Sequence, residues 1–567
     1  MSKKISYSST QVAKYLSSAP DFLNHYIKDL EEQITNLSNI GLALSKEKDM
    51  SKLLEMILLE AKRIANSDGG TLYMMTDDQR LRFEIMMTDS LDFHMGGTSG
   101  KDIPFYPIKL YTEEGKPNET MIAAFVALTG ETVNIPDAYK AKGFDFSGTK
   151  MFDEKTGYRS KSFLTVPLKN HEDEIIGVLQ LLNAQSNEKK RIISFTKEVQ
   201  GMVEALASQA AVAITNKNLI RDLEALFESF IKLIASAIDE KSPYTGGHCA
   251  RVPEITMMLA EAVHDTSNGP FAKTKFTDKE LYELKIAAWL HDCGKVATPE
   301  FVVDKSTKLE TIYDRIHEVK TRFTVLKRDE EIKKLKKELK IQKDASLSSD
   351  EKIKKIEKLK KQFRMKLKQF KEDEEFVKDS NIGGEFMSPD KKERIEEISK
   401  YKWKPNGQIQ NFLSEDEIYN LTIARGTLTA EERKVINDHI VVTIKMLEEL
   451  PYPKNLKNVP EFAGGHHEKM DGTGYPKGLN ESQMSTQAKI MAIADIYEAL
   501  TAADRPYKDG KKLSQAMRIM GFMKNDYHID EDLFEIFVQS GVYKKYAKKY
   551  LAKSQIDDVD EKTLLDL

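Results

Sequence analysis

The sequence predicts a multi-domain protein, in which an α+β domain is joined by a connecting helix to an all-α domain that carries an inserted helical hairpin. Three observations predict this arrangement. Short β-like runs gather within residues 41–217, apolar residues recur at helical spacing over 200–240 and in later segments around residues 286–290, 435–443 and 490–497, and a Lys/Glu-rich stretch lies between these segments. The 567 residues suffice for about four domains of ~150 residues each.

The composition excludes several classes of protein. The 86 basic and 90 acidic residues nearly cancel to a net charge of −4, which argues against a nucleic-acid coat or a polybasic membrane anchor. No apolar run approaches the ~20 residues that span a bilayer, and the first residues lack the apolar core of a signal peptide. Two distant cysteines, Cys249 and Cys293, do not make a disulfide framework. We therefore expect a soluble, cytoplasmic protein that binds neither a membrane nor a nucleic-acid polymer.

The α+β domain is expected over residues 41–217, after a helical segment over 1–40. Apolar residues at helical spacing around 53–61 predict a first helix, and a closing helix is predicted at about 196–217. Strands are predicted at 71–75, 83–87, 162–168 and 175–182. The turn-like residues between the last two runs predict a hairpin.

Several short motifs in this region resemble a GAF domain, a sensor of small molecules. They are Ile40-Gly41, Gly70-Thr71-Leu72-Tyr73, Asn134-Ile135-Pro136-Asp137-Ala138-Tyr139, Val166-Pro167-Leu168 and Ile176-Gly177-Val178-Leu179-Gln180-Leu181-Leu182-Asn183. Thr156-Gly157-Tyr158-Arg159, with the upstream Phe144-Asp145, is similar to the GAF domains that bind cyclic nucleotides. The resemblance implies an unidentified small-molecule ligand. A GAF core that serves only dimerisation is the alternative.

Residues 218–240 are expected to form a connecting signalling helix. Leu219, Leu223, Leu226 and Phe230 recur at steps of three and four residues, which favours pairing with the same helix of a second copy. The hypothesis is a homodimer, and an ordinary terminal helix of the sensor domain is the alternative.

A charged insertion is expected at about 327–400. Lys and Glu alternate over 327–378, and Ala345-Ser346-Leu347-Ser348-Ser349-Asp350 breaks the helical pattern. This pattern predicts an antiparallel helical hairpin. Its interspersed acids favour a solvated face over a nucleic-acid surface.

Five of the eleven histidines stand in contexts typical of metal ligands. An adjacent pair, His291-Asp292, ends an apolar helical segment, and Asp495 is a lone acid in another. A buried carboxylate is costly unless a metal or an ion pair compensates it. The full set of candidates is His248, His291, Asp292, His439, His466, His467 and Asp495. His439 follows a capping box that begins at Thr429, and His466-His467 precedes a glycine-rich loop.

Seven nitrogen and oxygen ligands without a cysteine suit two octahedral ions, such as iron or manganese, better than one tetrahedral zinc. Adjacent side chains diverge on a helix, so His466 and His467 are expected to serve two ions rather than one. Two-metal sites stabilise in-line displacement at phosphorus. The residues therefore predict phosphoester hydrolysis.

Residues 241–540 resemble an HD-GYP domain, a subgroup of the HD metal-dependent phosphohydrolases, with residues 541–567 left as a C-terminal tail. The matching residues are Pro243-Tyr244-Thr245-Gly246-Gly247-His248, His291-Asp292, the His439 helix, His466-His467-Glu468 with Asp471, Gly474-Tyr475-Pro476, and Asp495 followed by Arg505-Pro506-Tyr507-Lys508. The resemblance implies hydrolysis of cyclic di-GMP to linear pGpG and then GMP.

The resemblance also implies roles for individual residues. The seven candidates would hold two divalent ions, with Asp292 between them, and Asp292 and Lys295 would be the catalytic residues. The substrate would contact Lys295, Gly474, Tyr475, Pro476, Arg505 and Lys508. Tyr244 stands where some members carry a glutamate ligand, which favours two ions over three.

Two alternatives remain open. Another cyclic dinucleotide, such as cyclic GMP-AMP, fits the same ligand set, because substrate choice lies in contacts to the bases. A catalytically silent adaptor could instead use the Gly-Tyr-Pro face and the charged hairpin to bind a signalling protein, although it would not need seven ligands.

Overall fold

The computed structural model describes residues 21–186, 191–241, 247–384, 386–503 and 510–566. The chain divides into two compact units, residues 1–226 and 227–567. Among the described residues, no helix combines the length and the apolarity that crossing a bilayer requires.

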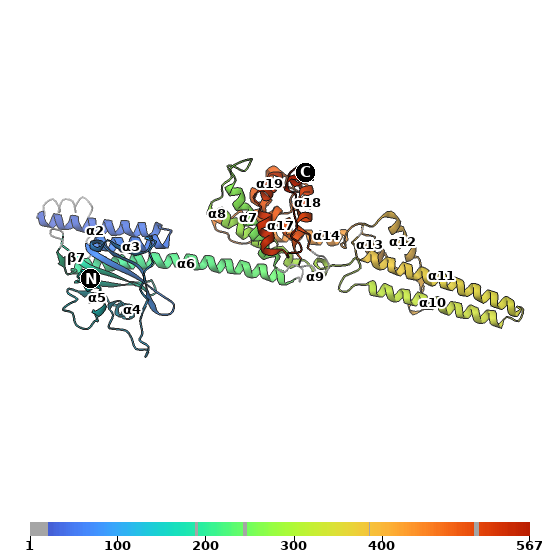
Figure 1. The fold of residues 1–567 in the computed structure, drawn as a ribbon, viewed down its shortest axis with the longest axis horizontal. Helices are drawn as coiled ribbons and strands as arrows, with labels where there is room; N and C mark the ends of the chain where they lie inside the picture. The colour runs from blue at the N-terminus through green and yellow to red at the C-terminus, as the bar shows by residue number, and fades with distance from the viewer. Residues whose placement is uncertain (1–20, 187–190, 242–246, 385, 504–509, 567) are drawn as a thin grey trace, which may run out of the picture. The chain divides into compact units, whose positions relative to one another are not determined.

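The first unit is built on one antiparallel sheet (Figure 1). Its strands are β1 (Ser67–Met75), β2 (Arg80–Thr88), β3 (Phe93–Gly96), β4 (Ile108–Lys109), β5 (Val133–Ile135), β6 (Phe163–Lys169), β7 (Ile175–Gln185) and β8 (Ile192–Ile193). Their order is β3-β2-β1-β7-β6-β5, with β4 beside β2 and β8 beside β7. The predicted hairpin is confirmed, with Val166 of β6 opposite Leu179 of β7.

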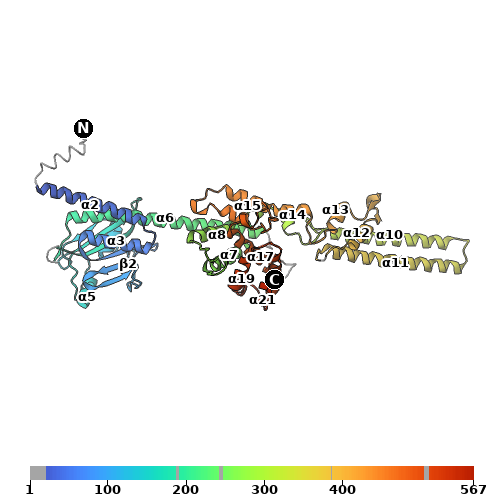
Figure 2. The same cartoon turned by 90° about the horizontal axis from the view of Figure 1, so that it is seen from above.

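Helices cover both faces of this sheet. On one face, α2 (Asp21–Lys46), α3 (Met50–Ala65) and the start of α6 (Lys197–Lys241) share an apolar core with the strands (Figure 2). On the other face, α4 (Ile122–Thr129) and the loops around it form a second core, and α5 (Ser147–Thr156) lies in the same chain segment. The α+β class predicted for this part of the chain is confirmed.

The closing helix and the connecting helix are one element. The sequence placed a boundary between residues 217 and 218, whereas α6 runs without interruption from Lys197 to Lys241. No glycine or proline follows Gly201 within this helix, so nothing in its backbone ends it earlier.

The second unit is mostly helical, as predicted. The helices before and within the insertion are α7 (His248–Asp265), α8 (Asp278–Leu290), α9 (Glu300–Val303), α10 (Ile316–Lys343), α11 (Ser349–Asn381), α12 (Pro389–Ser399) and α13 (Glu415–Leu421). Those that follow are α14 (Ala430–Asn437), α15 (His439–Glu448), α16 (Val459–Gly464), α17 (Thr486–Thr501), α18 (Leu513–Asn525), α19 (Glu531–Gln539), α20 (Val542–Tyr550) and α21 (Glu561–Asp566). Two short strands, β9 (Lys402–Trp403) and β10 (Gln410–Asn411), pair within the insertion.

The C-terminal segment is part of the core rather than the tail placed at 541–567. Tyr543 and Tyr546 of α20 are fully buried in the main helical core, and Leu564 of α21 joins them. The hydroxyl of Tyr497 on α17 donates to the carbonyl of Tyr543 at 3.0 Å. Lysines alternate with these aromatic residues in the sequence, which hides the apolar face of α20.

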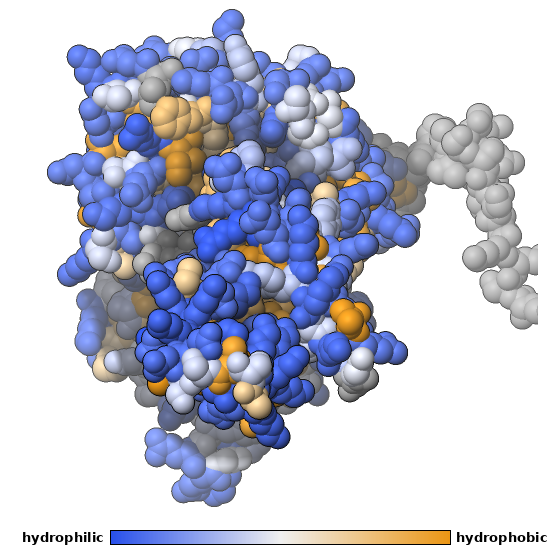
Figure 3. Space-filling model, turned by 90° about the vertical axis from the view of Figure 1, so that its right-hand side faces the viewer, coloured by the Kyte–Doolittle hydropathy of each residue, from blue (hydrophilic) through white to orange (hydrophobic). Residues whose placement is uncertain are grey.

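The predicted helical hairpin is present. Helices α10 and α11 lie side by side in both ribbon views (Figures 1 and 2). The base of the hairpin belongs to a separate small core whose residues run from Leu309 to Leu421, wider than the expected 327–400. In this core the Phe323 and Phe412 rings pack at a tilt, with centroids 4.5 Å apart. No residue between 327 and 369 is buried. Figure 3 shows a mainly hydrophilic face, as a solvated charged hairpin requires.

Candidate metal centre

Four of the five candidate histidines use Nδ1 for a hydrogen bond. In three of them, Nδ1 donates to the backbone carbonyl three residues earlier: His291 to Ala288 at 2.8 Å, His439 to Ile436 at 2.5 Å and His466 to Ala463 at 2.5 Å. His248 pairs instead with Oε2 of Glu498 at 2.6 Å. Because a carbonyl or carboxylate oxygen accepts, Nδ1 carries the proton and Nε2 is left as the ligand atom. This arrangement is typical of histidines that bind a metal.

Asp292 lies between His248 and His291 on one side and His439 on the other. Its Oδ2 is 3.1 Å from Nε2 of His248 and 3.3 Å from Nε2 of His291, and it also contacts the Lys295 ammonium. Its Oδ1 faces the other way and is 3.2 Å from Nε2 of His439. The two oxygens of one carboxylate therefore face two different sets of nitrogens.

Helix α17 adds Asp495 to the cluster. Its Oδ1 lies 3.3 Å from Nε2 of His248 and 3.8 Å from Nε2 of His291. Glu498, one turn later on the same face of α17, holds His248 and accepts from Arg251 at 2.6 Å. Thus one helix supplies both a candidate ligand and the residue that orients another.

The adjacent histidines lie in the turn after α16 rather than on a helix. Their ring centroids are 4.1 Å apart, and Nε2 of His467 is 3.3 Å from Nε2 of His439. Three groups have ligand atoms within 4.8 Å of one another: His439, His466 and His467; His291, Asp292 and His466; and His248, His291 and Asp495. Both adjacent histidines belong to the first group, and His466 also belongs to the second. The groups overlap, so the seven predicted residues form one cluster.

The helix that carries His439 is shorter than expected. The predicted capping box at Thr429 and Glu432 is present, but the helix it starts ends at Asn437. A second helix, α15, begins at His439 and buries His439, Ile440 and Thr443. Val435, one turn before His439, lies in α14 and is 40% exposed.

A metal fits this cluster on two grounds. Among the described residues, Oδ1 of Asp292 and Nε2 of His466 are buried without a hydrogen-bond partner. A buried polar atom left in this way is costly unless a ligand satisfies it. The donors are imidazole nitrogens and carboxylate oxygens, which suit iron or manganese.

The charges of the cluster point to the same conclusion. Burial opposes the charged form of His248, but the Asp292 and Glu498 carboxylates raise its pKa to about 9. Burial likewise opposes the charged form of His291, but the Asp292 and Asp495 carboxylates raise its pKa to about 10. Burial lowers the pKa of His467 to about 4. Without a metal, protons on two histidines balance the carboxylates, and a cation can replace those protons.

Gly294 allows the two halves of the cluster to meet. A Cβ at this position would lie 2.0 Å from the carbonyl oxygen of His439 and 2.5 Å from the amide nitrogen of Thr443. The Gly294 amide donates to the Thr443 hydroxyl at 2.9 Å. The short 3-10 helix η2 (Cys293–Ala297) therefore packs directly on α15.

The Gly-Tyr-Pro loop lies beside His467. The Tyr475 ring stacks on the His467 ring with centroids 4.8 Å apart and planes at 19°. Burial raises the pKa of Tyr475 to about 12. Glu468, which is buried, accepts from the amides of Lys477 at 2.7 Å and Leu479 at 2.9 Å. A Cβ on Gly474 would lie 2.5 Å from the Glu468 Cα, so the loop needs glycine there.

Some predicted positions are outside the described residues. Arg505 and Lys508 fall in 504–509, and Tyr244 falls in 242–246, so their roles stay predictions. Asp471 is exposed and caps its own turn by accepting from the Thr473 amide at 2.9 Å.

Sequence reasoning missed Glu498 and Arg251 as parts of the site, and it assigned no structural role to Gly294 or Glu468. Glu498 carried a signal, because a second acid three residues after Asp495 in an apolar helix shares its face. The packing role of Gly294 carried no signal, since the segment that packs on it is distant in the sequence.

Two family models match the chain. A GAF domain matches residues 49–214, and an HD domain matches residues 415–533. The HD match contains His439, His466, His467 and Asp495. The other three members of the cluster come before it and reach it through the fold.

Curated relatives match parts of the chain. A 3'3'-cGAMP-specific phosphodiesterase of Vibrio cholerae is 38% identical over 96 residues, 17% of this chain and 22% of the relative. A cyclic di-GMP phosphodiesterase of Pseudomonas aeruginosa is 44% identical over 79 residues, 14% of this chain and 18% of the relative. A dual 3',5'-cyclic-AMP and -GMP phosphodiesterase of Takifugu rubripes is 28% identical over 212 residues, 37% of this chain and 22% of the relative. The matches thus span about a fifth of each of these relatives.

Proposed function

We propose that this chain, in which a GAF domain is followed by an HD domain, is a metal-dependent phosphodiesterase that hydrolyses cyclic di-GMP to linear pGpG or GMP. One observation carries the proposal. Seven imidazole and carboxylate side chains from separate segments form one buried cluster, and two of its ligand atoms lack a hydrogen-bond partner among the described residues. In a purely structural cluster such unsatisfied atoms would cost stability without any compensation from a ligand.

The seven residues would hold two divalent ions, for which we propose iron or manganese. Ions of this kind activate a phosphodiester as Lewis acids and acidify a bound water. Lys295, held against Asp292, is placed to offset negative charge on a phosphate oxygen. Tyr475 presents an aromatic ring beside the cluster on which a base can stack, and Arg505 and Lys508 are proposed to contact the second phosphate.

The second candidate substrate is 3'3'-cyclic GMP-AMP. The specific observation that favours it is the match to the Vibrio cholerae phosphodiesterase, whose name gives that substrate. The metal cluster serves both substrates equally, because both present a phosphodiester to it. Contacts to the bases must decide between them.

We propose that the GAF domain regulates the enzyme and that the protein is a homodimer. Helix α6 exposes a row of large apolar side chains at alternating steps of four and three residues, namely Leu219, Leu223, Leu226, Phe230 and Leu233, each more than half exposed. This spacing is typical of the residues that form the seam of a two-stranded coiled coil. Leu226→Lys should convert the dimer to a monomer in sedimentation, and a monomeric wild type would contradict the proposal.

The test of the activity is hydrolysis by full-length protein purified without oxygen and supplied with iron or manganese. Cyclic di-GMP and cyclic GMP-AMP are offered separately, and the products are resolved by chromatography. Linear pGpG or GMP from cyclic di-GMP supports the proposal, and turnover of cyclic GMP-AMP alone supports the second candidate. Protein that binds no metal and hydrolyses neither substrate would overturn the enzyme assignment in favour of an adaptor.

A further inference from the structure

The last turn of α6 contacts both segments that carry the first candidate ligands. We infer that Asp239 and Lys241 in this turn are positioning residues of the metal centre, an inference that rests on the proposed function. Neither side chain belongs to the cluster itself. Each acts on the backbone that presents a ligand.

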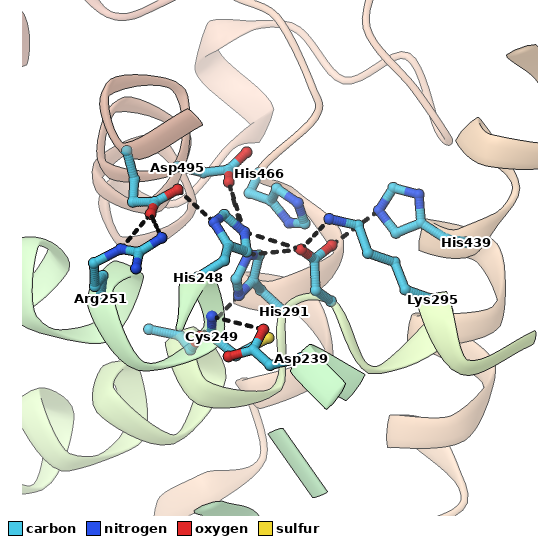
Figure 4. A network of polar contacts seen from close by, with 12 residues as sticks. Asp239, His248, Cys249, Arg251, His291, Lys295, His439, His466 and Asp495 are labelled. Atoms are coloured by element: carbon cyan, nitrogen blue, oxygen red, sulfur yellow. Dashed lines mark hydrogen bonds and ion pairs between the residues drawn. The ribbon is translucent and has the colours of Figure 1, made fainter. Parts of the chain in front are cut away.

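Asp239 holds the start of α7. Its Oδ2 accepts from the amide of Gly247 at 3.0 Å, and its Oδ1 accepts from the amide of Cys249 at 3.3 Å (Figure 4). These two amides stand on either side of His248, the first residue of α7. The N-terminal amides of a helix need acceptors, and the N-cap residue of α7 is Gly247, which has no side chain to supply one. A carboxylate from another helix therefore takes the place of the local cap.

Lys241 holds the segment that follows Asp292. Its ammonium donates to the carbonyls of Lys295 at 3.2 Å and Thr298 at 2.7 Å, and also to that of Val296. These carbonyls lie at the C-terminal end of η2, where a cation is favourable. Asp292 is the N-cap residue of η2, and Lys295 lies within η2.

The two contacts together constrain one distance in the cluster. Nε2 of His248 lies 3.1 Å from Oδ2 of Asp292, and these two residues stand on the two segments that α6 holds. Two residues apart on a helix, Asp239 and Lys241 point in nearly opposite directions, so the end of α6 can contact both segments at once. A shift or rotation of the last turn of α6 would change the spacing of these ligands.

This arrangement gives the connecting helix a physical means of acting on catalysis. Helix α6 begins at Lys197, within the residues matched by the GAF domain, and ends at Lys241. Outer contacts of this kind alter metal affinity or activity by roughly 10–100-fold when removed. We expect effects of that size from losing either side chain.

The experiment compares Asp239→Ala and Lys241→Met in the full-length protein. Glu240→Ala is the matched control, because this exposed residue lies between the two on the same turn. Mn²⁺ affinity is measured by calorimetry, and kcat and KM are measured with cyclic di-GMP. Both variants should bind Mn²⁺ ~10–100-fold more weakly and lower kcat more than they raise KM. Glu240→Ala should match the wild type.

Two conservative variants separate positioning from folding. Lys241→Arg keeps the cation and should restore most of the Mn²⁺ affinity, whereas Asp239→Asn keeps one acceptor oxygen and should fall between Asp239→Ala and the wild type. Wild-type Mn²⁺ affinity in both Asp239→Ala and Lys241→Met would overturn the inference. If the wild type binds Mn²⁺ but hydrolyses no cyclic dinucleotide, the proposed function fails while the calorimetry still decides this inference.

Discussion

The two units of the chain each bury a carboxylate among polar side chains, but they satisfy it differently. In the first unit, Asp68 accepts from the amide of Ser90 at 3.1 Å, from its hydroxyl at 2.6 Å, from Tyr158 at 2.6 Å and from Gln185 at 3.3 Å. In the second, Oδ1 of Asp292 is buried and has no hydrogen-bond partner in the part of the chain that the structure describes.

The difference separates a structural network from a binding site. Every contact of Asp68 comes from a donor of the protein itself, so the network stabilises the fold without a ligand. Asp292 faces nitrogens whose best partner is a cation. Tyr158, whose motif resembles those of GAF domains that bind cyclic nucleotides, belongs to the structural network, because it links Asp68 to Asn183.

The largest expected effect comes from removing the negative charge of Asp292. Asp292→Asn keeps the shape of the side chain but gives up one of the two oxygens that face the histidines. Several kcal/mol of transition-state stabilisation should be lost, which lowers kcat/KM by at least ~10³-fold. Metal analysis and steady-state kinetics measure this. Asp68→Asn is the matched variant and should lower only the stability of the first unit. Full metal content and activity in Asp292→Asn would contradict the assignment.

The protonation of the cluster predicts how metal affinity depends on pH. The pKa values of His248 and His291 rise to about 9 and about 10, so both are charged near pH 7 in the metal-free protein. Metal binding must release these protons, and affinity should rise about tenfold per pH unit for each proton released. His467, with its pKa lowered to about 4, releases none.

The same shifts predict the stability of the metal-free protein. A raised histidine pKa stabilises the fold fully below the unfolded value near 6.5, and this contribution is lost as the pH rises through 9 and 10.

Calorimetry of metal binding in buffers of different ionisation enthalpy, at pH 7 and pH 8, counts the protons that the two histidines release. Metal binding without proton release would refute the charged state of the two rings.

Gly294→Ala tests the close packing of the metal centre, and Gly201→Ala in the first unit is its control. The new Cβ would collide with the backbone of α15, so the free energy of unfolding should fall by ~2 kcal/mol and metal affinity should fall with it. Gly201→Ala on the exposed side of α6 meets nothing within 4 Å and should stabilise the helix by ~1 kcal/mol. Chemical denaturation of both variants measures the contrast. A neutral Gly294→Ala would show that the two segments can separate freely.

Tyr158→Phe should have a smaller effect, because Asp68 keeps its other donors. We expect the first unit to lose ~1 kcal/mol of stability while metal content stays unchanged. Tyr106→Phe is the control, since Tyr106 is 93% exposed. Thermal unfolding and metal analysis serve as readouts, and a loss of metal in Tyr158→Phe would connect networks that we treat as independent.

The smallest effect is expected from shortening the hairpin. No side chain between 327 and 369 is buried, and Lys334 lies over the Phe363 ring at 4.9 Å, so residues 335–362 can be replaced by a short Gly-Ser turn at that level. Metal content and unfolding temperature should stay near the wild-type values. A loss of metal would show that the outer hairpin supports the centre.

Much of this molecule is predictable from local patterns. The β6–β7 hairpin follows from two apolar runs around a turn, and the α10–α11 hairpin follows from a Lys/Glu-rich helical pattern around a serine-rich break. The α20 helix was missed because lysines interrupt its aromatic residues, so only the packing of Tyr543 and Tyr546 reveals its buried face.

The sequence by itself determined which side chains could bind metals, because imidazole and carboxylate chemistry is a property of the residue. The tertiary structure decided that seven of these side chains meet. It also decided that Glu498 and three backbone carbonyls orient four of the histidine rings, and that Gly294 lets α15 approach η2. These relations join segments up to some 250 residues apart, such as His248 and Glu498, and no local pattern encodes a contact at that separation.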